Sequence, residues 1–140
     1  VYKRQACNRC RQPLTYERMQ TMQVITSKNV IKESFNSPLF TGPEVTIQRL
    51  LPDSREFDVN IVTFGQGVRN KFHAHDHEQV LIVTAGKGII ATEDKQVVIT
   101  PGDVVLISPG EKHWHGATED SEFSHIYVSN PASQLNQLEA

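Results

Sequence analysis

Four side chains with metal-binding chemistry stand in two short segments of the sequence. His73, His75 and Gln79 lie in FHAHDHEQVLIV, and His113 follows in GDVVLISPGEKHWHGA. Alternate side chains of a β-strand share a face, so the two-residue step from His73 to His75 directs both imidazoles to one side. Gln79 opens an apolar run after a short polar bend, and we expect a neighbouring strand to carry it toward the same point. The spacing predicts one metal ion shared by these residues.

His113 must reach that point from another strand. Residues 101–103 read as a turn, 104–107 as a buried strand, and 108–110 as a second turn that sends the chain back. The segment before His113 therefore supplies the means to bring it to the other histidines.

The rest of the chain reads as short strands separated by turns. Glycine, proline and aspartate interrupt the apolar runs at even spacing, which is typical of a sandwich or a jelly-roll barrel. A chain of 140 residues is long enough for one domain. We therefore predict a single all-β domain, with strands at 45–51, 58–64, 71–75, 79–85, 88–93, 96–100, 104–107, 112–117 and 123–128.

The first histidine segment resembles the first signature motif of the cupin superfamily. In that motif a glycine, a His-x-His pair, an acid and a closing glycine follow one another at set spacings. Gly67, His73, His75 and Gly86 match it, and Gln79 stands where the acid usually lies.

The second segment resembles the second cupin motif. Gly102, Pro109, Gly110 and His113 stand at the matching positions, and Ser108 takes the place of the usual proline. The departure is mild, because Pro109 and Gly110 still make the turn.

The resemblance narrows to small single-domain cupins grouped with carboxymuconolactone-decarboxylase-associated proteins. The stretches EQVLIVTAGKGII and PGDVVLISPGEKHWHGA, with a Phe-x-His-Ile strand after them, carry it over residues 39 to 130. Some members of that group are manganese-dependent hydroxynitrile lyases with a site of three histidines and one glutamine. The resemblance implies a cupin double-stranded β-helix, a jelly-roll barrel, that binds one divalent transition-metal ion. It favours manganese or iron over zinc, nickel, cobalt or copper.

A ligand set of three imidazoles and one amide carries no charge. The charge of a divalent ion would stay uncompensated by its ligands, whereas a carboxylate would cancel part of it. Such an ion is a stronger Lewis acid, lowers the pKa of bound water and prefers anionic or enolisable oxygen ligands. Four protein ligands leave two positions of an octahedral ion open to substrate, water or O₂.

Strand parity selects further residues near the ion. If His113 points into the barrel, His115 does too, and Trp114 faces outward. His125 and Tyr127 share a face of the last strand, and the matching positions in the resembling cupins line the pocket. His115 and His125 are therefore the candidate acid and base residues.

The resemblance also indicates which residues form the substrate pocket. Asn60 and Val62, on the strand before the first motif, match pocket positions, and Tyr127 joins them. Two alternatives stay open, because Tyr127 could be a packing residue and His125 a hydrogen-bonded core histidine.

Other polar residues near the first motif have more ordinary interpretations. Glu78 is the alternative to Gln79 as a ligand, although it lies one residue too early. His77 follows in the bend and is expected to be exposed to solvent, or else to act as a surrogate ligand. Arg69 is expected on an exposed approach, where it could pair with an anionic substrate.

Three functions fit such a site. In the favoured one a metalloenzyme polarises a small carbonyl, hydroxyl or carboxylate substrate while His115 or His125 moves a proton, as in a lyase, isomerase or decarboxylase. The alternatives are an oxygenase that binds O₂ beside the substrate on iron, and a non-catalytic binder of a metal or a small ligand. No helix-turn-helix pattern fits in the chain, which disfavours a transcription regulator.

The two ends are expected to lie outside the barrel, which should span 21–130. The pentapeptide VYKRQ reads like translated transposase end sequence from a shotgun library, so 1–20 are expected to be a non-native or disordered lead-in. The native start would then be Met19 or Met22. Residues 131–140 are polar, and we expect a tail that ends in a short, weakly docked helix or frays.

Composition narrows the expected partners. The net charge of −2 offers no basic face for nucleic acid, and no apolar run is long enough to span a membrane. Without an apolar signal region, a cytoplasmic location is expected. Cys7 and Cys10 form a chance C-x-x-C, because no second pair and no βαβ pattern accompanies them.

The expected partners are a small-molecule substrate and a second copy of the chain. Outward apolar residues, including Val80, Ile82 and Trp114, need cover on one face, which favours a homodimer.

Overall fold

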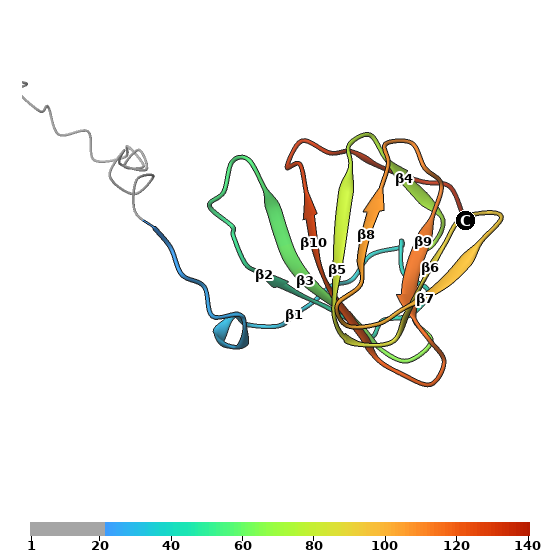
Figure 1. Cartoon of the computed structure of the whole chain (residues 1–140), viewed down its shortest axis with the longest axis horizontal. Helices are drawn as coiled ribbons and strands as arrows, with labels where there is room; N and C mark the ends of the chain where they lie inside the picture. The colour runs from blue at the N-terminus through green and yellow to red at the C-terminus, as the bar shows by residue number, and fades with distance from the viewer. Residues whose placement is uncertain (1–21) are drawn as a thin grey trace, which may run out of the picture.

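The computed structural model describes residues 22–140, and nearly all of its regular structure is β-sheet (Figure 1). The one helical element among these residues is the 3-10 turn η1 (Ser27–Asn29), and none of them form a helix that could cross a membrane. The predicted all-β jelly-roll domain is confirmed. Its strands are β1 (Glu33–Ser34), β2 (Val45–Arg49), β3 (Asp58–Phe64), β4 (His73–His75), β5 (Gln79–Gly86), β6 (Gly88–Ala91), β7 (Gln96–Ile99), β8 (Val104–Ile107), β9 (Trp114–Ala117), β10 (Phe123–Ser129) and β11 (Leu135–Gln137).

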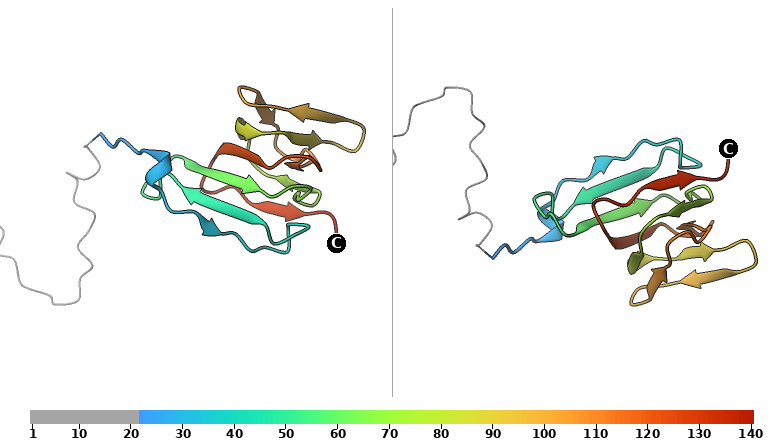
Figure 2. Two further views of the ribbon diagram at one scale, coloured as in Figure 1. Left: turned by 90° about the horizontal axis from the view of Figure 1, so that it is seen from below. Right: turned by 90° about the horizontal axis from the view of Figure 1, so that it is seen from above.

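Two walls enclose the barrel interior. One wall is a six-stranded antiparallel sheet in the order β1-β2-β3-β10-β5-β8. The other combines the sheet β7-β6-β9 with the pair β11-β4, and the backbone of 68–75 joins them. Within that join Ala117 N–H donates to the Val68 carbonyl, and Asn70 N–H donates to the His115 carbonyl, both at 2.9 Å. Figure 2 shows β6 and β7 on the opposite side of the molecule from β1 and β2.

Each predicted strand has a counterpart in the structure, with differences at the strand ends, whereas β1 and β11 were not predicted. Strands β3 and β8 have the predicted bounds, whereas β4 and β9 each begin two residues later than predicted. The two histidine segments meet where these strands begin, and they pair there through the isolated bridge between His73 and His113. The expectations for 1–20, including Cys7 and Cys10, lie outside the described residues.

The C-terminal segment differs from the helix or frayed end expected for it. Leu135–Gln137 forms β11, which pairs antiparallel with β4 and so lies beside the two histidines of that strand. Without β11, one edge of β4 would have unpaired backbone N–H and C=O groups. Backbone pairing satisfies these groups whatever the side chains of the added strand are. A polar sequence can therefore form this strand without any apolar periodicity.

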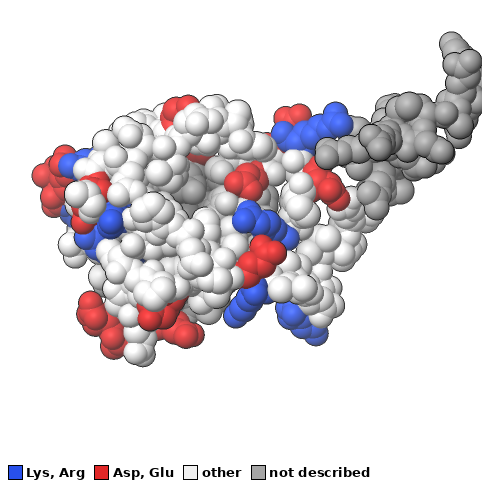
Figure 3. Space-filling view, turned by 180° about the vertical axis from the view of Figure 1, so that it is seen from behind, with Lys and Arg blue, Asp and Glu red and all other residues white. Residues whose placement is uncertain are grey.

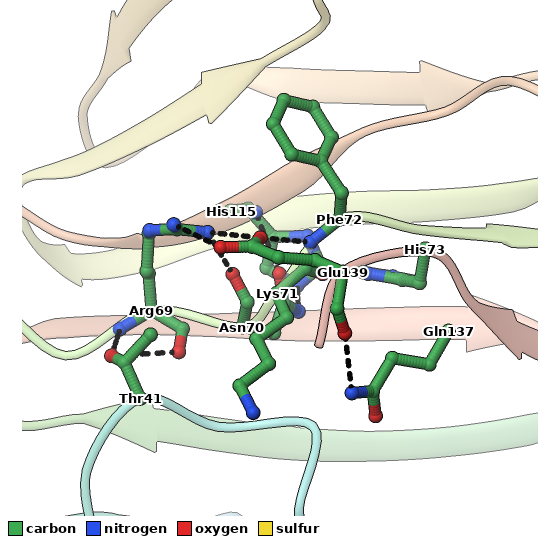
Figure 4. A network of polar contacts seen from close by, with 9 residues as sticks. All are labelled: Thr41, Arg69, Asn70, Lys71, Phe72, His73, His115, Gln137 and Glu139. Carbon is green, nitrogen blue, oxygen red and sulfur yellow. Dashed lines mark hydrogen bonds and ion pairs between the residues drawn. The ribbon is translucent and has the colours of Figure 1, made fainter.

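Side-chain contacts of Glu139 hold the C-terminal segment just after β11 (Figure 4). The Arg69 guanidinium donates to both carboxylate oxygens of Glu139, at 2.9 and 3.1 Å. Glu139 also accepts the N–H of Phe72 at 2.8 Å, and Leu138 N–H donates to the Phe72 carbonyl at 2.8 Å. These contacts attach the C-terminal segment to the stretch that leads into His73.

Apolar side chains fill one end of the barrel. Phe64 and Phe123 are fully buried and stack at 6.1 Å between ring centroids. His115 and His125 each lie about 6 Å from the Phe64 ring, so the histidines begin where the apolar core ends. The core consists of Val45, Ile47, Val62, Phe64, Val68, Val83, Ile99, Ala117 and Phe123.

All four turn glycines of the resembled motifs, Gly67, Gly86, Gly102 and Gly110, have positive φ, and two of them have contrasting surroundings. Gly86 has φ of 72°, and a Cβ added to it would overlap the carbonyl oxygen of Glu122. Gly102 has φ of 96°, and a Cβ there would meet nothing within 4 Å. Only the first position therefore combines backbone strain with a steric clash.

Gly86→Ala should destabilise the protein more than the matched control Gly102→Ala. The control carries only the conformational cost of an alanine in the left-handed region, about 1–2 kcal/mol. Gly86→Ala adds an overpacking cost of about 1–3 kcal/mol, because backbone must move. Urea denaturation of both variants measures the free energies of unfolding, and equal losses would contradict the close approach of Gly86 to Glu122.

Candidate metal centre

Backbone pairing brings the two histidine segments together. His73 N–H donates to the His113 carbonyl and His113 N–H donates to the His73 carbonyl, each at 3.0 Å. Strand alternation then places His75 on the same side as His73, and Gly110 N–H donates to the His75 carbonyl at 2.7 Å. The ring centroids of the three histidines are consequently 4.3 to 5.3 Å apart.

The ring nitrogens of these histidines suit a metal ion. Nδ1 of His73 contacts the Lys71 carbonyl at 2.7 Å, and Nδ1 of His113 contacts the Glu111 carbonyl at 2.8 Å. A carbonyl oxygen only accepts, so each Nδ1 carries the proton and each Nε2 keeps its lone pair. One nitrogen from each of His73, His75 and His113 lies within 4.8 Å of the others. The cluster could hold a metal ion.

Gln79 lies with His73 and His75 on the wall of one cavity. It is the first residue of β5 and only 8% exposed, and its Oε1 is buried without a hydrogen-bond partner. Nε2 of His75 and Nε2 of His113 are also buried and unpartnered. Each such atom costs about 1–3 kcal/mol unless something binds it, and a divalent ion would satisfy all three. Glu78, the alternative ligand, is exposed to solvent.

Burial keeps the imidazoles neutral. Burial, together with the neighbouring His113, lowers the pKa of His73 from its ordinary value of 6.5 to about 3. The same two causes lower the pKa of His75 to about 4, and burial lowers the pKa of His113. At neutral pH these rings therefore carry no proton on the nitrogens that would bind metal.

Asn70 fixes the orientation of His115, a role that no sequence motif indicated. Oδ1 of Asn70 accepts the backbone N–H of His115 at 2.8 Å, and Nδ2 of Asn70 lies 3.2 Å from His115 Nε2 (Figure 4). Since the amide oxygen is already used as an acceptor, the amide nitrogen faces the ring and donates to Nε2. The proton of neutral His115 is then on Nδ1, which is buried without a partner.

His125 lies in the same cavity wall as His115 and has a different environment. It is fully buried, its ring centroid is 4.9 Å from that of His115, and neither of its nitrogens has a partner. Burial lowers its pKa to about 4. A core histidine held by hydrogen bonds would have partners for its ring nitrogens. His125 has none, so one of its ring nitrogens keeps a lone pair free for a ligand.

The cavity itself has a volume of about 200 Å³. Two of the three residues expected to form the substrate pocket, Val62 and Tyr127, line it, whereas Asn60 lies behind the wall and contacts Asp58 and Tyr127. Asp58 was not foreseen from the sequence. The apolar part of the wall consists of Phe35, Leu39, Phe40, Val62, Phe64 and Leu135.

Two cationic or titratable residues near the first motif lie away from the cavity lining. The Arg69 guanidinium is paired with Glu139 and lies 4.7 Å from the centre of the Trp114 ring, so it is occupied rather than free to pair with a substrate. His77 has a side chain that is 40% exposed and contacts Asp76.

Comparison with known proteins identifies the domain family and the fold. Residues 60–129 match the cupin domain family Cupin_2. A cupin-like protein from Thermotoga maritima is 35% identical and has a TM-score of 0.70, with 76% of this chain and 84% of that chain covered. The polyketide cyclase RemF from Streptomyces resistomycificus, 17% identical over 86% of this chain and 87% of its own, has a TM-score of 0.74 and shares the fold.

One curated relative has a named activity. The (R)-mandelonitrile lyase of Granulicella tundricola is 50% identical over 68 residues, which are 48% of this chain and 52% of the relative. The chain thus spans about half the length of the curated relative that it matches.

The buried neutral histidines should make the stability of the metal-free protein depend on pH. The pKa values of His73, His75 and His125 are about 3 to 4 in the fold against 6.5 ordinarily, so between those values the unfolded chain binds more protons. Stability should be complete above the unfolded pKa and fall as pH drops toward 4, by up to about 1.4 kcal/mol per histidine per pH unit. Thermal unfolding of chelator-treated protein across this range measures the slope.

Two variants identify the source of that slope. His125→Leu removes one buried imidazole and should flatten the pH dependence, whereas Val98→Ala, on the exposed strand β7, removes no titratable group and should leave it unchanged. Identical slopes for His125→Leu and the wild type would contradict the role of burial.

Proposed function

The chain belongs to the cupin family, and on that premise we propose that it is a mononuclear metalloenzyme acting on a small oxygen-bearing substrate. The ligands would be His73, His75, Gln79 and His113. The observation that carries the proposal is the set of buried, unpartnered atoms in the histidine cluster and on Gln79, beside a cavity that a further pair of buried histidines also lines. The uncharged ligand set favours a Lewis-acid role, and the resemblance to manganese-dependent cupins favours manganese or iron as the ion.

The two further histidines would have different roles. When bound, a divalent ion supplies Lewis acidity that stabilises negative charge on a substrate oxygen. His115 keeps its Nε2 on Asn70 and presents an N–H at Nδ1, so it is suited to donate a hydrogen bond to that charge. His125 is neutral and has a free lone pair, so it is suited to accept a proton. Asn70 is thus a positioning residue.

A lyase reaction is the first to test, because the curated relative is named for one. In cyanohydrin cleavage the hydroxyl proton moves to a base, the carbon–carbon bond breaks, and cyanide leaves with the electron pair and takes up a proton. The products are an aldehyde and hydrogen cyanide. A base and a hydrogen-bond donor on one cavity wall, as in the pair of His125 and His115, meet the needs of such a reaction.

Variants of the metal-loaded enzyme separate metal binding from proton transfer. His113→Ala should lose the metal, whereas His125→Ala should keep it and lower the rate of mandelonitrile cleavage by about 10²-fold or more, the usual scale for a general base. Gln79→Glu should bind the metal more tightly yet react more slowly, because the added charge weakens Lewis acidity. Metal analysis and cyanide release measure these effects.

Glu78→Gln is the matched control, since Glu78 is exposed, and it should change neither metal content nor rate. Metal retention with unchanged ligand binding and turnover in both His125→Ala and Gln79→Glu would favour a non-catalytic binder. Consumption of O₂ by the iron-loaded protein would favour the oxygenase.

We also propose that the protein is a homodimer through the outer face of the six-stranded sheet. Two cross-strand rows of four apolar side chains lie on that face, in register across β3, β10, β5 and β8. Such a continuous apolar area favours cover by a second copy. By contrast, acidic and basic side chains are interspersed on the face shown in Figure 3. The rows are Ile61, Ile126, Ile82 and Val104, and Val59, Val128, Val80 and Leu106.

Leu106→Lys should dissociate the dimer. Leu106 is 58% exposed in the single chain, so a lysine there can be solvated in the monomer but would be buried in the dimer. Val98→Lys, at a residue that is also 58% exposed but lies on β7, is the control and should leave the dimer intact. Light scattering at micromolar concentration measures both, and a monomeric wild type would refute the proposed interface.

A further inference from the structure

We propose that the cavity end formed by Asp58 and Tyr127 is a hydrogen-bond acceptor site that selects substrates with a distal hydroxyl or ammonium group and rejects a distal carboxylate. This inference rests on the proposed function, because it names the substrate class of the same cavity.

Strand pairing sets the distance between this site and the metal ligands. Ser129 of β10 pairs with Asp58 on one side and with Gln79 on the other, and all three residues line the cavity. Two strand spacings therefore separate the backbones of Asp58 and Gln79, about 10 Å. A small aromatic molecule can span such a distance with one polar group at each end.

A closed set of hydrogen bonds uses the side-chain donors of Asn60 and Tyr127. The amide nitrogen of Asn60 donates to Asp58 Oδ1 at 2.7 Å and to the Tyr127 hydroxyl oxygen at 2.6 Å. The Tyr127 hydroxyl in turn donates to Asp58 Oδ2 at 3.1 Å. Burial and the Asp58 carboxylate raise the pKa of Tyr127 to about 12, so this hydroxyl keeps its proton. What remains for a ligand is the unused lone pairs of Asp58 and Tyr127.

No protein cation lies in the cavity to receive a second anionic group. Among the described residues that line it, Asp58 is the one carboxylate, and none is lysine or arginine. Arg49, which lies near Asp58 in a neighbouring hollow, pairs with Glu33 at 3.4 Å. Ser129 and Asn130 add only neutral polar groups at the rim. A distal carboxylate would therefore face Asp58 with no cation in the cavity lining, because the nearest cation, Arg49, acts on Tyr127 from outside the cavity.

The middle of the cavity suits an aromatic ring. Phe40 and Phe64 meet edge to face at 5.8 Å and form part of the apolar wall with Val62. The favoured substrate class is thus a small aromatic compound with a carbonyl or hydroxyl at the metal end and a hydrogen-bond donor at the Asp58 end. Dicarboxylates are excluded.

Ligand binding to the metal-loaded protein tests this without any turnover. Benzoate, 4-hydroxybenzoate and terephthalate each carry one carboxylate for the ion and differ only at the distal position. We expect 4-hydroxybenzoate to bind most tightly and terephthalate most weakly by calorimetry. The two should differ about tenfold or more, the scale of a hydrogen bond to a charged group.

Asp58→Asn removes the charge at nearly constant size and should reduce the difference between 4-hydroxybenzoate and terephthalate several-fold. Asp94→Asn makes the same change of net charge at an exposed site in the turn between β6 and β7, and should leave the ranking intact. Metal content and thermal unfolding report whether each variant is folded.

The outcomes separate this inference from the proposed function. Terephthalate binding as tight as 4-hydroxybenzoate binding in the wild type would overturn the inference even if mandelonitrile is cleaved. The expected ranking without any cleavage would support it while the lyase proposal fails. Failure of all three acids to bind would overturn the assignment of the cavity as a ligand site.

Discussion

The two reciprocal backbone hydrogen bonds between His73 and His113 are the constraint on which the site depends. Once the two segments are paired at that register, strand alternation alone decides that His75 and His115 face the same interior. Backbone carbonyls two residues earlier in the chain then orient the rings of His73 and His113. The geometry of the candidate metal centre is therefore mainly a property of the backbone.

Burial connects the fold to the chemistry. The same removal of water that lowers the pKa values of His73, His75 and His125 leaves ring nitrogens without hydrogen-bond partners. A barrel built only for stability would fill these positions with apolar side chains, as it does around Phe64 and Phe123. Unsatisfied polar atoms gathered at one end of an otherwise apolar interior indicate a candidate ligand-binding site there.

The sequence was informative wherever a short-range rule determines position. Alternation and turn residues located the strands and placed His73, His75, Gln79 and His113 near one another, as the structure does. It was silent on residues positioned by pairing between distant strands. Asn70 acquires its role only because its backbone bridges toward β9, and Asp58 only because β3 lies beside β10. The strand β11 has no periodic pattern, since the free edge of β4 dictates it.

The charges of the cavity follow from the same arrangement. At one end of the cavity the protein contributes uncharged candidate metal ligands, and at the other end it contributes the Asp58 carboxylate. Any positive charge in the cavity must therefore come with a bound ion or ligand. A substrate that develops negative charge would be drawn to an ion bound beside Gln79 and repelled by Asp58, whose backbone lies about 10 Å from that of Gln79. Attraction and repulsion act along the same axis and orient the substrate in one direction. A carboxylate at Gln79 would weaken this polarity, because negative charge would then lie at both ends.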